Sequence, residues 1–387
     1  MNSVPRDLDG LGISDMFATR LKEAVAGLGR FNLAVFGKTG AGKSTLINAV
    51  FGSEVAPTGM GESVTRGLNY YPHAGGTFGL YDSEGFETGV SGDAILAGLQ
   101  QFVSGSRADT ADRHIHAVWY VVRWSDRRFE VPQQSFVRGL AAMGLPVIMV
   151  VTQVPTRVGH GNEGTSIHPD AQAFAAYLRD LNLPLSPNNR VILTNAQADP
   201  FTDAAVFGVT ELLEATYEVV PQVATAALTA VQILDWERKR QAVRRIIRQS
   251  VVVAGGVGAT PIPFSDAAVL VPTQVTMIAR ITAAYGLPAD RSRTLAAAAA
   301  VVLTGGATMA GRYLAGTLLK FVPGGAVAGS AISGAVAGSL TQAVGTAWAR
   351  VCEHALSLPP EEREAFLAGP GPRDLFVAAM KRKPGRK

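Results

Sequence analysis

The segment from Phe31 to Ser44 reads Phe-Asn-Leu-Ala-Val-Phe-Gly-Lys-Thr-Gly-Ala-Gly-Lys-Ser, and the fold of this chain is decided there. It opens with apolar residues at 33–36, a run of the length of a buried strand. A glycine-rich turn follows at 37–42, and a helical pattern begins at Lys43. Strand, loop and helix therefore follow one another with the spacing Gly-x-x-x-x-Gly-Lys-Ser. This arrangement predicts a loop that holds phosphate groups.

Each part of the motif has a chemical reason. Glycines let the backbone curl so that successive N–H groups point at phosphate oxygens. The helix N-terminus that follows favours an anion. We expect Lys43 to reach the β- and γ-phosphates and the Ser44 hydroxyl to bind Mg²⁺. The residues expected around the phosphates are Gly37, Lys38, Thr39, Gly40, Ala41, Gly42, Lys43, Ser44 and Thr45.

The composition sets limits on the class of protein. The chain has 387 residues, of which 47% are hydrophobic and 17% charged, and it contains 42 glycines. Such a chain is too apolar to be disordered and is long enough for two or three domains. Its one cysteine, Cys352, excludes an internal disulfide framework and fits a reducing compartment. The first residues lack the pattern of a signal peptide, so we expect a cytoplasmic protein.

Strand and helix patterns alternate through the first half of the chain. Strands are predicted at 68–72, 77–81, 115–123, 146–152 and 190–194, and helices at 130–143, 167–182 and 208–219. Apolar strands separated by helices predict an α/β fold, a three-layer αβα domain of the P-loop NTPase kind with a mostly parallel sheet. The site is expected at the carboxyl ends of those strands. An amphipathic helix at 14–29 is expected to pack on this domain as a lead-in.

A second motif follows the strand at 77–81. The sequence Asp82-Ser83-Glu84-Gly85 has the form Asp-x-x-Gly, which is weak alone but strong shortly after a phosphate loop. We expect Asp82 to hold Mg²⁺ through water and Gly85 to sense the γ-phosphate. The segment 52–67 between the two motifs is rich in glycine and polar residues and is predicted to be a mobile loop.

Together these residues resemble the Era-like branch of the translation-factor-related GTPases over about residues 30–220. The wording Lys-Ser-Thr-Leu-Ile-Asn-Ala-Val-Phe-Gly after the loop is typical of that branch. The resemblance implies a GTP- and GDP-binding protein that depends on Mg²⁺, with catalytic roles for Lys43, Thr65 and Gly85. It implies that the metal is held by Ser44, Thr65 (less favourably Thr58) and Asp82.

Two positions depart from the family pattern. The family reads guanine with Asn-Lys-x-Asp, and here that place holds Thr152-Gln153-Val154-Pro155. Proline has no carboxylate for the base, so GTP is favoured over ATP by family likeness alone. Thr152 and Gln153 are expected to keep part of the ring contact. Asn195 and Ala196 occupy the place of the family's guanine O6 loop.

The second departure is Phe86, at the place where some of these GTPases position water with glutamine. A phenyl ring cannot orient water, which predicts slow hydrolysis without a partner. Candidates for stabilising charge in the transition state are Arg66, Arg123, Arg127 and Arg128, although each also fits a plain surface or structural arginine. A scaffold that binds nucleotide without turnover and an ATP-using variant remain alternatives.

From about residue 221 the chain becomes helical and rich in Ala, Gly and Val. Helices are predicted at 249–259, 266–286, 293–321 and 325–356, after a basic stretch at 238–248. This half resembles the YcjF-type conserved hydrophobic domain of bacterial proteins. The domains are therefore expected at 1–29 (lead-in), 30–220 (GTPase), 221–360 (apolar helical domain) and 361–387 (segment with a basic tail).

The role of the helical half stays open among three interpretations. No charged residue lies between Lys320 and Arg350, and small residues recur there every four positions, as in membrane helix pairs. Flanking basic residues fit an anionic membrane surface, which would place the protein at the inner face of the cell membrane, peripheral or integral. A tightly packed soluble helical bundle is the second interpretation, and nucleic-acid contact is the third and least favoured. The helical domain is expected to act at a membrane or by self-association. His114 and His116 are expected to be structural.

Overall fold

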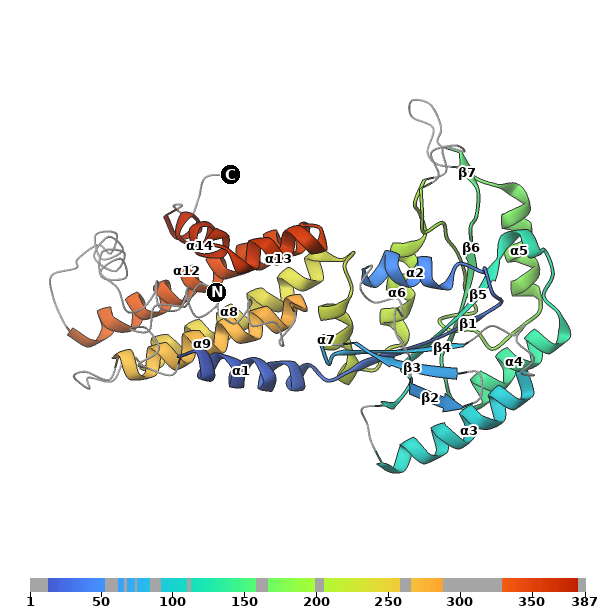
Figure 1. Ribbon diagram of the computed structural model, residues 1–387, viewed down its shortest axis with the longest axis horizontal. Helices are drawn as coiled ribbons and strands as arrows, with labels where there is room; N and C mark the ends of the chain where they lie inside the picture. Colours follow the sequence, from blue (N-terminus) through green and yellow to red (C-terminus); the bar gives the residue numbers. More distant parts are fainter. Residues whose placement is uncertain are drawn as a thin grey trace. The chain divides into compact units, whose positions relative to one another are not determined.

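A seven-stranded sheet organises residues 29–235, one of the two compact units of the chain (Figure 1). The computed structural model describes residues 13–52, 62–65, 68–73, 75–83, 92–109, 113–157, 166–198, 205–257, 266–287 and 329–381. The sheet has the order β2-β3-β4-β1-β5-β6-β9. Its strands are β1 (Phe31–Gly37), β2 (Glu62–Thr65), β3 (Leu68–Pro72), β4 (Phe78–Ser83), β5 (Ala117–Arg123), β6 (Val147–Thr152) and β9 (Val191–Leu193).

The sheet is mostly parallel, as predicted. β1 pairs in parallel with β4 and β5, and β6 pairs in parallel with β5 and β9. Only β3, near one edge, runs antiparallel to its neighbours, which are β2 and β4. β2, β3 and β4 lie on one side of β1, and β5, β6 and β9 lie on the other. Where the chain changes from one side to the other, the carboxyl ends of the parallel strands leave a crevice for a ligand.

Helices cover both faces of the sheet because the central strands are buried on both sides. Leu33 and Val35 of β1 face one core, which α2 (Lys43–Phe51), α6 (Val209–Val219) and α7 (Gln222–Val231) complete. The alternate residues Ala34 and Phe36 face the other core, formed with α3 (Gly92–Asp109), α4 (Val131–Ala142) and α5 (Pro169–Asp180). The predicted α/β fold with three layers is confirmed.

Two boundaries differ from the sequence prediction. Residues 62–65, at the end of the segment predicted as a mobile loop, form β2 and pair with β3. α7 lies beyond the expected end of the nucleotide domain at 220, yet Ala224 and Leu228 are buried in the core of the sheet. The unit therefore extends to Asp235.

The second unit is all helical. Its helices are α1 (Ile13–Leu28), α8 (Trp236–Val257), α9 (Asp266–Tyr285), α12 (Gly329–Ser357), α13 (Pro360–Ala368) and α14 (Gly371–Lys381). A Cβ on Gly345 would lie 2.8 Å from Ile247 Cγ1 and 2.9 Å from Met277 Sδ. The absence of a side chain at Gly345 thus lets α12 pack closely against α8 and α9. The helix predicted at 249–259 is the end of α8, and the one predicted at 293–321 lies outside the described residues.

The N-terminal helix belongs to this second unit, which corrects the expectation that it packs on the nucleotide domain. Phe17 and Leu21 of α1 are fully buried in the core that α8, α9 and α12 form. The chain therefore enters the helical unit, leaves it to build the sheet, and returns to it at Trp236. Cys352 is fully buried in α12, as predicted, and burial raises the pKa of its thiol.

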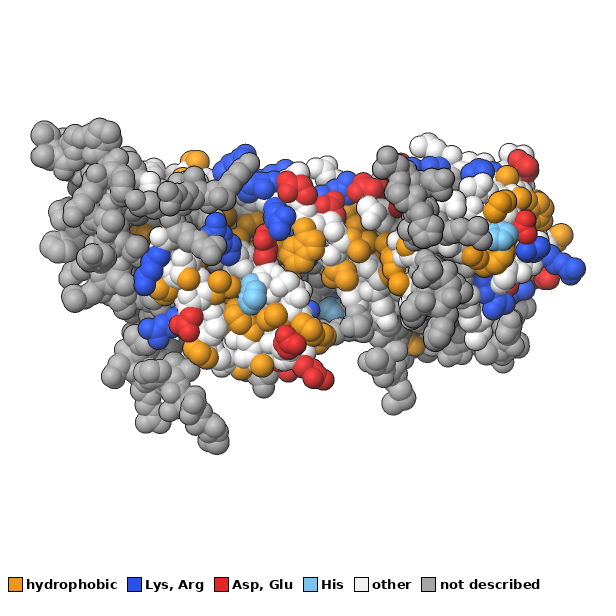
Figure 2. Space-filling view, turned by 90° about the horizontal axis from the view of Figure 1, so that it is seen from above, with side chains coloured by type: hydrophobic (Ala, Val, Ile, Leu, Met, Phe, Trp, Pro, Cys, Tyr) orange, Lys and Arg blue, Asp and Glu red, His pale blue; other side chains and the backbone are white. Residues whose placement is uncertain are grey.

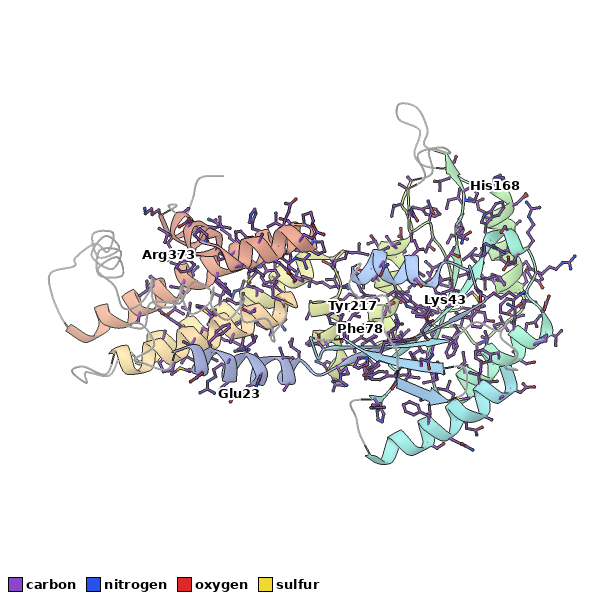
Figure 3. All side chains as sticks on the ribbon, in the orientation of Figure 1. Glu23, Lys43, Phe78, His168, Tyr217 and Arg373 are labelled. Carbon is purple, nitrogen blue, oxygen red and sulfur yellow. The ribbon has the colours of Figure 1, made fainter. Side chains whose placement is uncertain are left out.

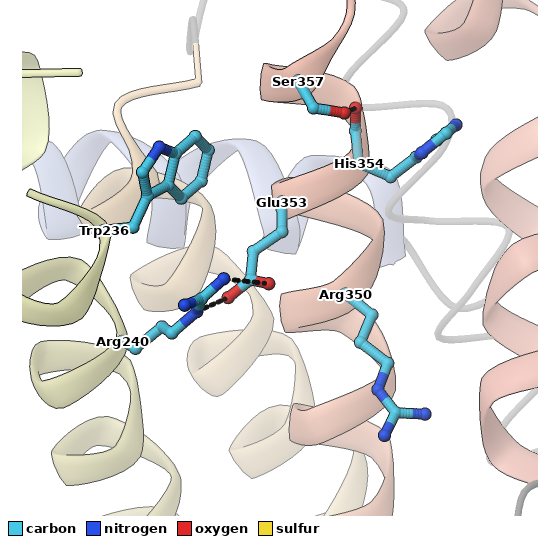
Figure 4. A pocket seen from close by; sticks show the side chains of 6 residues that line it. All are labelled: Trp236, Arg240, Arg350, Glu353, His354 and Ser357. Carbon is cyan, nitrogen blue, oxygen red and sulfur yellow. Dashed lines mark hydrogen bonds and ion pairs between the residues drawn. The ribbon is translucent and has the colours of Figure 1, made fainter. Parts of the chain in front are cut away.

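The surface of the helical unit carries a pocket of about 600 Å³ between α8 and α12 (Figure 4). Its lining residues are Trp236, Arg240, Arg350, Glu353, His354 and Ser357. Arg240 pairs with Glu353 at 2.9 Å, and the Tyr285 hydroxyl also donates to this carboxylate.

Among the helices that the structure describes, none combines the length and the apolar character needed to span a bilayer. Basic and acidic side chains are interspersed on the face that Figure 2 draws.

His116 stabilises the sheet at the end remote from the phosphate loop. Its Nδ1 accepts a hydrogen bond of 2.9 Å from the Asn32 main-chain N–H, and its own main-chain N–H donates to Asn32 O. The Asn32 side chain in turn donates to His114 O at 2.8 Å. Burial, and then the proximity of His114, lower the pKa of His116 to about 4. These contacts support the structural role predicted for the two histidines.

We expect the stability of the sheet unit to fall as the pH drops from 6.5 toward 4. The pKa of His116 is about 4 when folded and 6.5 when unfolded, so the unfolded chain takes up a proton first. The stabilising contribution is complete above pH 6.5 and declines below it, by about 3 kcal/mol at most. Urea unfolding across this range should show a flatter pH dependence for His116→Gln than for the wild type. His354→Gln, at an exposed histidine, is the control and should keep the wild-type slope.

Candidate functional site: the phosphate loop

The loop between β1 and α2 has the backbone that phosphate binding requires. Gly40 and Gly42 adopt positive φ angles of 76° and 88°, which turn the main chain sharply. The Ala41 N–H donates to Lys38 O at 3.2 Å, and the Leu46 N–H donates to Gly42 O at 3.0 Å, where α2 begins. The loop thus leads directly into a helix N-terminus, the arrangement that favours an anion.

Lys43, the first residue of α2, lies beside the loop (Figure 3). Its Nζ donates to Gly37 O at 3.1 Å and to Lys38 O at 3.3 Å. These carbonyls hold the ammonium group against the inner side of the loop. A cation at that place attracts the phosphate oxygens that the neighbouring N–H groups would bind.

Two residues at the carboxyl end of β6, Thr152 and the Gln153 that follows it, brace the loop from the side. The Thr152 hydroxyl, which is 3% exposed, donates to Ala41 O at 2.5 Å. Gln153 adopts a φ of +56°, and its Nε2 donates to Gly40 O at 2.9 Å. The sequence predicts part of a base contact for these residues and does not predict their hydrogen bonds to the loop. The only signal in the sequence is their place at the end of a buried strand.

The residues expected to hold Mg²⁺ fit that ion as far as they are described. Ser44 is an exposed residue in the first turn of α2, and Asp82 is the residue before the last of β4, opposite Val35 of the neighbouring β1. Hydroxyl and carboxylate oxygens are the ligands that Mg²⁺ prefers, with phosphate and water completing its shell. No group of three His, Cys, Asp or Glu suited to a metal occurs among the described residues. Thr65 is the last residue of β2, and its side chain is not described.

The loops expected to read the base lie side by side. The Val154 N–H donates to Thr194 O at 3.1 Å, and Thr156 Oγ1 accepts from the Ala205 N–H at 3.2 Å. Asn195 Nδ2 donates to Gln197 O and Ala205 O, at 2.8 and 3.0 Å, so this side chain supports its own loop. Ala196 follows it, half-buried, and only main-chain groups are polar there.

Pro155 lies in the same region without a side chain that could read guanine. Its carbonyl accepts from the His168 N–H at 3.1 Å, which ties the loop to the start of α5. Beside it, β7 (Thr156–Arg157) and β8 (Ser166–Ile167) form a two-stranded ladder. Pro155 is therefore held in place by its main chain, and its side chain offers no hydrogen-bonding group to a base.

Two of the arginines considered for charge stabilisation are engaged elsewhere. Arg123 pairs with Asp126 at 2.9 Å, and Arg127 pairs with Asp170 at 2.8 Å while lying over the Trp124 ring. Arg128 is exposed. Arg66, Thr58, Gly85 and Phe86 lie outside the described residues.

Comparison with known proteins agrees with this geometry. Residues 32–153 match a family model described as "50S ribosome-binding GTPase", and residues 222–366 match one described as "Domain of unknown function (DUF697)". A search of curated proteins found no match to the chain. The first match spans β1, the loop, Asp82 and Thr152. Together with the sheet order, this match shows that residues 29–235 are similar to a P-loop GTPase domain, and the second match shows that most of the helical unit is similar to a domain of unknown function.

Several solved structures are similar. A probable GTP-binding protein, engB, shares 17% identity over 49% of this chain and 97% of its own, with a TM-score of 0.30. A dimerisation-deficient mutant of Toc33 from Arabidopsis thaliana shares 16% identity over 58% and 94%, with a TM-score of 0.32. An NFeoB mutant from S. thermophilus bound to GDP shares 10% identity over 87% and 96%, with a TM-score of 0.27.

Proposed function

We propose that this chain is an Era-like, Mg²⁺-dependent GTP-binding protein that hydrolyses GTP slowly and acts as a nucleotide switch. The observation that carries the proposal is the loop from Gly37 to Ser44, in which the Lys43 ammonium group contacts two loop carbonyls at a helix N-terminus. Mg²⁺ would neutralise charge on the β- and γ-phosphates and would be held by Ser44, Asp82 and Thr65. The protein's own residues bind and orient the triphosphate, and Thr152 and Gln153 keep the loop open for it.

Phe86 supports the slow turnover in this proposal. The residue after the Asp-x-x-Gly motif has no group that could orient water, so hydrolysis depends on another residue or on a partner. The rival is a scaffold that binds GTP without turnover. Single-turnover measurements with Mg²⁺ distinguish the two, because a scaffold returns unchanged GTP and a slow enzyme releases phosphate in proportion to bound nucleotide.

The switch would act through the segments 53–67 and 83–92, which the γ-phosphate and Mg²⁺ would order and hydrolysis would release. The helical unit would read this change, either by membrane association or by self-association. The chain passes from one unit to the other twice, at Leu28–Gly29 and at Asp235–Trp236. The second crossing is anchored within the sheet unit, because the Ile233 N–H donates to Val50 O, near the end of the helix that the loop begins.

We expect the protein to prefer GTP over ATP but to discriminate poorly between GTP and ITP. A main-chain N–H near Ala196 would donate a hydrogen bond to O6 of guanine or hypoxanthine, whereas the 6-amino group of adenine, itself a donor, would meet this N–H unfavourably. Residue 155 is a proline and has no carboxylate to bind the guanine 2-amino group. ITP lacks this amino group, so its affinity should differ from that of GTP by less than about threefold. Competition of GTP, ITP and ATP against a fluorescent guanine nucleotide measures this.

The matched variant for this test is Pro155→Asp, which supplies the missing carboxylate. It should raise the preference for GTP over ITP by about tenfold. ATP binding as tight as GTP binding would favour the ATP-using variant. A wild-type preference for GTP over ITP of a hundredfold would mean that another group reads the 2-amino group.

A further inference from the structure

The outer face of α8 combines positive charge with exposed apolar side chains. Arg245 and Arg248 are exposed, and one turn further on Val252 is 74% and Val253 is 53% exposed. Residues three, four and seven apart lie on one side of a helix, so Arg245, Arg248 and Val252 share a stripe that Val253 borders. We call these four residues the α8 basic–valine face.

The opposite side of α8 fixes this orientation. Val243, Ile246 and Ile247 are buried in the core of the helical unit. Ala254 is 4% exposed, and the Ser250 hydroxyl, also buried, donates to Ile246 O. The helix cannot rotate to hide the valines without exposing this larger apolar side, so the basic–valine face is a fixed feature of the unit.

The charge on this face is not neutralised from within the described chain. Arg240 is paired with Glu353, and Arg244 forms an ion pair with Glu237. Across the helix, Arg280 donates to the neutral Gln249 side chain at 2.9 Å. No described acidic side chain pairs with Arg245 or Arg248. Two adjacent turns therefore present cations, and the next turn presents valines.

We infer that the α8 basic–valine face docks on an anionic phospholipid surface. Arginines can bind lipid phosphates, and the valines, one helical turn further along the same stripe, can reach the boundary of the acyl chains when α8 meets the surface at a tilt. A nucleic acid would use the arginines but would gain nothing from Val252 and Val253, because backbone contacts are made with phosphates. The combination of both groups on one face therefore favours lipid. This inference does not depend on the nucleotide site.

The test is flotation of the full-length protein with vesicles. Vesicles of phosphatidylcholine with about 30% phosphatidylglycerol should carry the protein upward, and vesicles of phosphatidylcholine alone should not. Raising the salt from about 0.1 to about 0.5 M should weaken the binding, because exposed charges are screened. Arg245→Glu with Arg248→Glu should lower the partition coefficient by at least about 25-fold, since each arginine contributes about fivefold. Val252→Asp with Val253→Asp should also lower it and should do so at both salt concentrations.

The matched control reverses two other exposed arginines, Arg179 on α5 and Arg373 on α14 (Figure 3), to glutamate. This double variant changes the net charge equally and should float like the wild type. Circular dichroism melts and GTP binding show that every variant is folded.

Three results would overturn the inference. The first is unchanged flotation of the Arg245→Glu, Arg248→Glu variant, which would place any lipid contact elsewhere. The second is equal binding to vesicles with and without phosphatidylglycerol. The third is a wild-type protein that does not float with the vesicles. In that case binding to a DNA or RNA duplex, or self-association in sedimentation, through this face would identify the other occupant.

Discussion

Replacing Lys43 by alanine is expected to weaken GTP binding by at least about 100-fold. The ammonium group already lies within 3.1–3.3 Å of two loop carbonyls, and it is the cation next to the turn where the phosphates would lie. Hydrogen bonds between charged partners contribute about 1.5–3 kcal/mol each, and Lys43 would make two of them to the β- and γ-phosphates. Titration with a fluorescent GTP analogue measures the change.

Lys38→Ala is the control within the same loop. Lys38 contributes its carbonyl to the loop, and the carbonyl survives this substitution. GTP binding should therefore change by less than about fivefold. The stability of Lys43→Ala should stay close to that of the wild type, because the loop bonds that involve Ala41, Gly40 and Leu46 do not need the ammonium group. A Lys43→Ala protein that binds GTP as tightly as the wild type would refute the assignment of the phosphate site.

The sequence predicted the nucleotide domain well because its signals are local. The apolar run at 33–36, the glycines and Lys43 are contiguous, so strand, loop and helix could be placed from one segment. Strands such as β6, buried at every position, also stand out as continuous apolar runs. Asp82 could be placed at the end of its strand for the same reason, and the structure puts it beside β1.

Features that depend on distant partners could not be predicted in this way. The apolar positions Phe17 and Leu21 show that α1 has a buried side, but the same pattern fits packing on the sheet or on α9. The bracing of the loop by Thr152 and Gln153 joins residues more than 110 positions apart and needs a left-handed backbone at Gln153. Glutamine, unlike glycine or asparagine, gives no sequence signal for that conformation.

Replacing Gly37 by alanine is expected to reduce both the stability of the sheet unit and its affinity for GTP. Gly37 ends β1 with a φ of +152°, and it pairs with Val121 of β5. A Cβ at this position would lie 2.3 Å from Val121 O, a main-chain atom in the centre of the sheet. The clash can be relieved only by moving β1 away from β5 or by distorting the loop. We expect the free energy of unfolding to fall by about 3 kcal/mol.

Gly40→Ala separates the two effects. Gly40 also has a positive φ, of 76°, but no atom lies within 4 Å of the position of an added Cβ. Its substitution brings backbone strain of about 1–2 kcal/mol without a steric clash. Urea unfolding should therefore place Gly37→Ala clearly below Gly40→Ala in stability. Because the Gly37 carbonyl also accepts the hydrogen bond of Lys43, the displacement in Gly37→Ala should weaken GTP binding as well. Equal free energies of unfolding for the two variants would contradict the close approach of β1 and β5 at Gly37.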